Sequence, residues 1–169
     1  FGQNNPIEPL SGITTPDFII PSVSEKAYGY FELDKKSEDY LLENVHNIKD
    51  DLTKSSAWFS LWESFLRNKI SADQMMQTVI TALPYENDVQ GLTSRLGYLR
   101  TIYWGFTNDQ ERQSKYLELG ESIWQLMNKV SDSGQKKVLY DAFANIALQE
   151  SDVARLISLW NKTTTIKRL

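Results

Sequence analysis

The sequence has no cysteine and one histidine, and these shortages exclude several kinds of site. Without cysteine, the 169-residue chain cannot form a disulfide, an iron–sulfur cluster, a cysteine-ligated zinc site or a cysteine nucleophile. With His46 alone, it cannot build a site that needs two or three imidazoles. Asn47 and Asp50 follow His46 where a zinc peptidase helix has Glu and a second His, so that motif is absent. We interpret His46 as a partly exposed residue at a helix end; the alternative is a small hydrolase that uses His46 or unrecognised carboxylates.

Positive charge and long apolar runs are also scarce. The chain has 22 acidic and 18 basic residues and a formal net charge of -4, which argues against nucleic acid as a partner. A basic group near the C-terminus is too small for a nucleic-acid footprint. No apolar run approaches the ~18–20 residues of a membrane span, so no membrane partner is expected. The group near the C-terminus consists of Arg155, Lys162, Lys167 and Arg168.

The motifs of phosphate loops and nucleophile elbows are missing from the sequence as well. The acidic pairs Glu38-Asp39 and Asp50-Asp51 are adjacent, so their side chains point in different directions on a helix and do not suit glycosidase chemistry. Asp50 is instead typical of a helix cap. Residue chemistry alone therefore predicts no enzyme, and we assign no catalytic, cofactor-binding or metal-binding residue.

Proline is confined to one part of the chain. Residues 1–24 contain Pro6, Pro9, Pro16 and Pro21, four of the five prolines, and proline cannot continue a helix. We predict an extended linker over residues 1–24, with a short strand at 18–20, and a second strand over residues 27–33, which are rich in aromatics. Because the sequence starts without an initiator Met, we expect a piece of a longer protein, and the compartment stays unknown.

Residues 25–169 are predicted to form an all-α domain. Apolar residues recur there at helical spacing and indicate about seven helices in an antiparallel, α-solenoid-like array. The five tryptophans are expected in the core. Pro84 is expected to end the third helix. The apolar stripes span residues 41–48, 58–66, 76–83, 92–103, 120–127, 139–147 and 153–160, and the expected N-caps are Asp50, Ser71, Thr107, Ser133 and Ser151, with capping boxes at Ser71/Gln74 and Thr107/Gln110.

Several short motifs occur in a distinctive order along the chain. They are Tyr28-Gly-Tyr-Phe-Glu-Leu-Asp34, Tyr40-Leu-Leu-Glu-Asn44, Ser56-Ala-Trp58, Leu61-Trp62-Glu63, Ala82-Leu-Pro-Tyr-Glu86-Asn-Asp88 and Leu96-Gly-Tyr-Leu99 with Trp104. This order resembles the C-terminal helical domain of the aminopeptidase N-like zinc peptidases, the gluzincin aminopeptidases. The resemblance covers roughly residues 21–162. Many members of that family have Arg where this chain has Tyr30 or Phe31, which leaves the subfamily open.

The resemblance implies a non-catalytic domain that shapes and closes the substrate chamber of a zinc aminopeptidase. In that family the zinc site and the Gly-x-Met-Glu-Asn motif lie upstream, so no zinc or other cofactor is assigned to this chain. The implied partners are the catalytic and β-sandwich domains of the parent protein and its peptide substrate. The alternative is a free-standing helical scaffold that binds a protein or peptide in its groove.

Overall fold

A computed structural model describes residues 12–21, 29–114, 116 and 119–166 of the chain. The described residues form eight α-helices and no strand, which confirms the prediction of an all-α fold. Seven of the helices correspond to the seven apolar stripes, and the short α5 is additional. The helices are α1 (Lys35–Asn44), α2 (Asp51–Leu66), α3 (Ala72–Ala82), α4 (Val89–Gly105), α5 (Asp109–Ser114), α6 (Leu119–Lys129), α7 (Ser133–Ile146) and α8 (Glu150–Trp160), with short 3₁₀ helices at Val45–Asn47 and Leu83–Tyr85.

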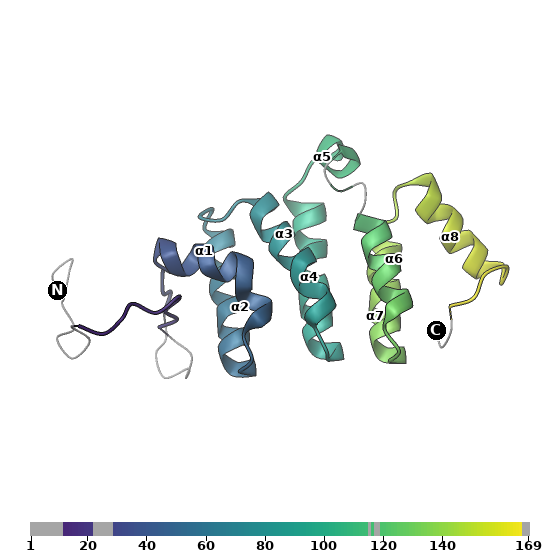
Figure 1. Ribbon diagram of the computed structural model, residues 1–169. Helices are drawn as coiled ribbons and strands as arrows, with labels where there is room; N and C mark the ends of the chain where they lie inside the picture. The colour runs from purple at the N-terminus through teal and green to yellow at the C-terminus, as the bar shows by residue number, and fades with distance from the viewer. Residues whose placement is uncertain (1–11, 22–28, 115, 117–118, 167–169) are drawn as a thin grey trace.

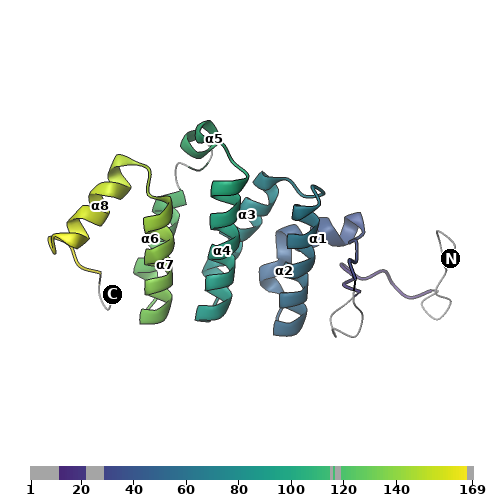
Figure 2. The same cartoon turned by 180° about the vertical axis from the view of Figure 1, so that it is seen from behind.

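The helices are arranged as a row of hairpins. Helices α1 and α2, α3 and α4, and α6 and α7 pair with each other, and contacts between α1 and α3 and between α4 and α7 join the pairs. The row runs from α1 at one end to α8 at the other, and α5 lies beyond the ends of the longer helices (Figures 1 and 2). This is the array of short-linked antiparallel helices that a solenoid builds.

Two of the five expected N-caps are in place. The Asp50 carboxylate accepts a hydrogen bond from the backbone of Thr53 at the start of α2. Ser71 caps α3 within a complete capping box with Gln74. Helix α3 ends at Ala82, directly before the 3₁₀ helix that contains Pro84, as expected.

The other three predicted caps are wrong. Asn108, one residue after Thr107, exchanges the reciprocal capping bonds with Glu111, so the predicted box is displaced by one position. Asp132 caps α7 in place of Ser133. Gln149 precedes α8 without a side-chain cap, and Ser151 lies inside that helix.

The two predicted strands are also wrong where the structure describes them. Residues 18–20 and 29–33 have no strand pairing, and residues 27 and 28 lie outside the described part. The segment before α1 is held by that helix instead: the Ile19 amide donates to Ser37 Oγ at 2.9 Å, and the Phe18 ring stacks on Tyr40 with centroids 5.5 Å apart. Within residues 1–24, which we predicted as a linker, positions 1–11 and 22–24 are not described.

The core runs through the hairpins, but it contains fewer tryptophans than expected. Trp58 is fully buried on α2, and Trp62 and Trp124 are half-buried. Trp104 is 46% exposed and Trp160 is 87% exposed, so the prediction of a core role was wrong for these two. The largest fully buried side chains are Trp58, Phe143, Leu41, Leu61, Ile70, Met75, Met76, Leu92, Leu99, Ile102, Ile123 and Met127.

Candidate functional site

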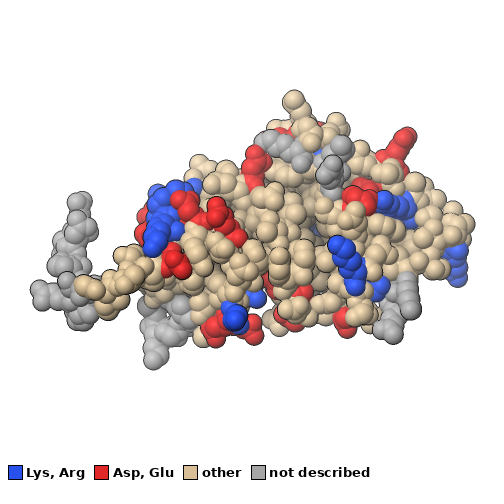
Figure 3. All heavy atoms as spheres, viewed as in Figure 1, with Lys and Arg blue, Asp and Glu red and all other residues tan. Residues whose placement is uncertain are grey.

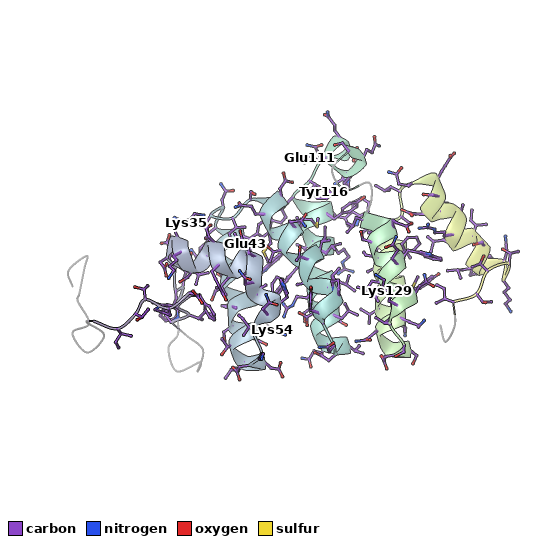
Figure 4. The ribbon with its side chains drawn as sticks, in the orientation of Figure 1. Lys35, Glu43, Lys54, Glu111, Tyr116 and Lys129 are labelled. Atoms are coloured by element: carbon purple, nitrogen blue, oxygen red, sulfur yellow. The ribbon has the colours of Figure 1, made fainter. Side chains whose placement is uncertain are left out.

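The single histidine packs against an aromatic ring at the end of α1. His46 is half-buried in the 3₁₀ helix after α1, and its ring stacks on Tyr85 with centroids 4.5 Å apart. Within the described residues there is no cluster of three or more His, Asp or Glu side chains that could hold a metal ion. The charged side chains labelled in Figure 4 come from α1, α2, α5 and α6 and are spread along the array.

Glu38, Asp39 and Asp50, three carboxylates of the adjacent acidic pairs, have partners within their own helices. Glu38 and Asp39 both contact Lys35 within α1, at 3.2 Å and 2.7 Å. Asp50 is the cap of α2, and its hydrogen bonds from Thr53 lower the pKa of the Asp50 carboxyl. These carboxylates therefore stabilise helix starts and turns, as the sequence predicted for Asp50.

Two of the four basic residues near the C-terminus, Arg155 and Lys162, lie in the described part. Arg155 is paired with Glu121 of α6 and approaches Asp152 of its own helix. Lys162 lies just beyond α8 with a left-handed backbone φ of 56°. Lys167 and Arg168 lie outside the described residues.

The most unusual group of side chains is one that the sequence did not indicate: an ion pair buried among aromatic rings between α2 and α4. Arg95 of α4 donates from Nε to Glu86 Oε1 at 3.3 Å, and their side chains are 8% and 6% exposed. The guanidinium carbon of Arg95 lies 4.3 Å from the ring centroid of Trp58. The Trp62 and Tyr98 rings stack with centroids 4.2 Å apart. We call Trp58, Trp62, Glu86, Arg95 and Tyr98 the Arg95 cluster.

The start of α4 positions the acidic half of this cluster. Asp88 caps α4, because its Oδ1 accepts the Gly91 amide at 2.7 Å. A Cβ atom at Gly91 would lie 2.5 Å from Glu86 Oε2 and 3.0 Å from Asp88 Oδ2. Glycine therefore lets both carboxylates approach the first turn of α4, where the helix dipole favours negative charge.

The buried positive charge of Arg95 determines which neighbours this cluster needs. Burial lowers the pKa of the Arg95 guanidinium from its ordinary value, and the neighbouring Glu86 carboxylate opposes that change. An arginine side chain keeps its charge in proteins, so Arg95 needs a nearby anion and the negative faces of the surrounding rings. Within the Arg95 cluster, no nucleophile is paired with a base. Its contacts are of the kind that hold α4 against α2.

Most of the motifs that carry the family resemblance meet around this cluster. Trp58 and Trp62 come from the α2 motifs, Glu86 from the motif before α4, and Tyr98 from the α4 motif. The Tyr30 ring, from the first motif, lies 3.9 Å below the guanidinium carbon of Arg67 at the end of α2. Trp104, by contrast, stands at the exposed end of α4.

Two apolar stripes face outward. On α2, Leu52, Phe59 and Leu66 recur every seven residues and are 51%, 61% and 51% exposed. We call them the α2 stripe. On α8, the α8 stripe consists of Val153, Ile157 and Trp160, which are 41%, 54% and 87% exposed. Residues at these spacings lie on one face of a helix, so each stripe places its three apolar side chains on the same exposed face.

Charge is unevenly distributed over the surface. In the face shown in Figure 3, acidic and basic side chains gather toward the edges, and the middle is mostly uncharged. No helix within the described residues is long and apolar enough to cross a membrane. Exposed apolar stripes and an uncharged face are features of surfaces that contact another protein or domain.

Comparison with known proteins adds no family. No protein-family model matches the chain, and no curated protein matches it significantly.

Proposed function

We propose that this chain is the non-catalytic helical domain of a zinc-dependent aminopeptidase, where it shapes and closes the substrate chamber. The observation that carries the proposal is the order of the motifs, from Tyr28-Gly-Tyr through Trp58 and Trp62 to Glu86 and Tyr98. The packing is consistent with it, since most of those motifs interlock at the Arg95 cluster. They are thus residues that a helical domain of this kind needs for its shape.

A domain with this role would work by exclusion. A row of helices beside an active site leaves room for a short peptide and keeps folded proteins out, so that the neighbouring catalytic domain reaches free N-termini only. The α2 stripe and α8 stripe supply apolar surface for contacts with the other domains of such a protein. Zinc and the catalytic groups would be supplied by the upstream domain.

The first experiment is an assay of the purified chain with an alanine anilide substrate, with and without added zinc. We expect no release of the anilide under either condition. Zinc-dependent hydrolysis by this chain alone would overturn the proposal. In the full-length protein, replacing Phe59 of the α2 stripe with Ser should change the preference for peptide length more than the hydrolysis rate of the anilide.

The second candidate is a free-standing scaffold that binds a protein or peptide. The exposure of the α2 stripe favours it, because an apolar helix face of this kind is a typical contact surface for an amphipathic partner. Affinity capture with the wild-type chain and with a Phe59→Ser control separates the two. A single partner that is not a peptidase domain, retained by the wild type and lost by the variant, would favour the scaffold.

A further inference from the structure

Helix α8 buries less apolar surface against the rest of the protein than α7 does. Asp152 is the one buried residue of α8, and Leu156 and Leu159 are half-buried against the core. The α8 stripe faces solvent on the same helix. Apolar burial therefore stabilises α8 less than α7, whose buried apolar residues are Leu139, Phe143 and Ile146.

Polar contacts with α6 are the other interactions that hold α8 in place. One terminal nitrogen of Arg155 pairs with Glu121 Oε2 of α6, and the other lies 3.7 Å from Asp152 Oδ1. The guanidinium carbon of Arg155 is 5.0 Å from the ring centroid of Trp124, also on α6. Arg155 thus contacts a carboxylate and an aromatic ring of α6 and a carboxylate of its own helix. We call these four residues the Arg155 latch.

The first turn of α6 is shaped to receive the Asp152 carboxylate. A Cβ atom at Gly120 would lie 2.2 Å from Asp152 Oδ2 and 2.8 Å from its carboxyl carbon, so glycine is needed for this approach. The dipole of α6 favours a negative charge at this end of the helix. Burial raises the pKa of the Asp152 carboxyl, while Arg155 opposes the rise. The packing of α8 on α6 therefore depends on charge as well as on shape.

We propose that α8 opens as a separate unit: it leaves α6 while α1–α7 stay folded, and the Arg155 latch sets how often this happens. Elements with few buried apolar contacts are the ones that open below the global unfolding free energy. Opening brings Leu156 and Leu159 into solvent beside the α8 stripe, so the open state has apolar surface that the closed state covers. This inference concerns the conformations of the chain and does not depend on the proposed function.

Native-state hydrogen exchange of the full chain tests the proposal. We expect the amides of α8 to exchange at least about tenfold faster than those of α4 and α7. Arg155→Met should raise the exchange rate of α8 by a further factor of about ten, as expected for loss of a partly exposed charged contact, and leave α4 and α7 unchanged. The control is Arg100→Met, the same change at an exposed α4 position, which should leave α8 unchanged.

Two further measurements identify the latch itself. Glu121→Gln should accelerate α8 exchange in the wild type but have little additional effect in Arg155→Met. Either substitution alone already removes the same Arg155–Glu121 ion pair. About 0.5 M sodium chloride should accelerate α8 exchange in the wild type, since salt screens partly exposed ion pairs. If Arg155→Met fails to fold, this salt response decides the matter.

Several outcomes would overturn the proposal. One is exchange of α8 at the same rate as α7, because the helix would then open only with the whole domain. Another is an Arg155→Met variant whose α8 amides exchange no faster than those of Arg100→Met. A third is wild-type α8 exchange that does not respond to salt.

Discussion

Replacing Glu86 should destabilise the fold, because it leaves the Arg95 charge buried among aromatic rings without its anionic partner. The Arg95 side chain is 8% exposed and Glu86 Oε1 is 3.3 Å from its Nε. Breaking a buried ion pair by removing one partner costs about 3–5 kcal/mol of unfolding free energy. The Trp58 ring 4.3 Å from the guanidinium carbon keeps part of the stabilisation, so we expect Glu86→Gln to cost about 3 kcal/mol, near the lower end.

Urea unfolding of the purified chain, followed by circular dichroism at pH 7, measures this cost. The matched control is the double variant Glu86→Gln/Arg95→Met, which removes both charges and keeps similar volume. Because no charge is left unpaired, its unfolding free energy should lie within about 1.5 kcal/mol of the wild type. A cost below about 1 kcal/mol for Glu86→Gln, or a double variant as unstable as the single one, would refute the reasoning.

Three other predictions concern burial, capping and pH. Trp58→Ala should cost about 3–5 kcal/mol of unfolding free energy by leaving a cavity in the core, whereas Trp160→Ala at the exposed end of α8 should change it by less than about 0.5; urea unfolding checks both. Ser71→Ala removes the capping box of α3 and should cost about 1 kcal/mol, while an unchanged urea midpoint would contradict this cap. Hydrogen bonds from Ser37 lower the pKa of the Asp34 carboxyl, so their contribution is present above the ordinary pKa near 3.8 and disappears as the pH falls through the lower, folded-state pKa. Asp34→Asn should flatten this part of an acid titration of stability.

The helices could be predicted from the sequence because their apolar spacing is unambiguous. Each of the seven stripes lies within a helix or its immediate 3₁₀ extension, except for a terminal residue or two. The caps were harder, because several residues able to cap stand next to one another. Asn108 and Asp132 cap the helices in place of Thr107 and Ser133. Each lies one residue from the expected cap, and its side-chain oxygen accepts the amide of the third residue after it.

Periodicity did not reveal which faces are covered. Trp160 shares a face with Val153 and Ile157, and a helical stripe of this kind usually packs inward. On α8 this face is exposed, because the helix is seated through Asp152, Leu156 and Leu159 instead. The sequence pattern specifies which residues share a face of a helix. Whether neighbouring helices cover that face is decided by the packing.

The Arg95 cluster could not be predicted, because an arginine within a helix usually faces solvent. Arg95 finds its anion, Glu86, in the segment before α4, and only the Trp58 ring over its guanidinium depends on how α4 packs against α2. The family resemblance included Glu86 in its motif without assigning a role to it, and the packing explains that residue in physical terms.

The nucleotide sequence upstream of the Phe1 codon in the gene tests the central proposal most directly. If the chain is the helical domain of a zinc aminopeptidase, the same reading frame should encode His-Glu-x-x-His with a downstream Glu and a Gly-x-Met-Glu-Asn-like motif. A reading frame that begins just before Phe1, or an unrelated domain upstream, would contradict the proposal and favour the binding scaffold.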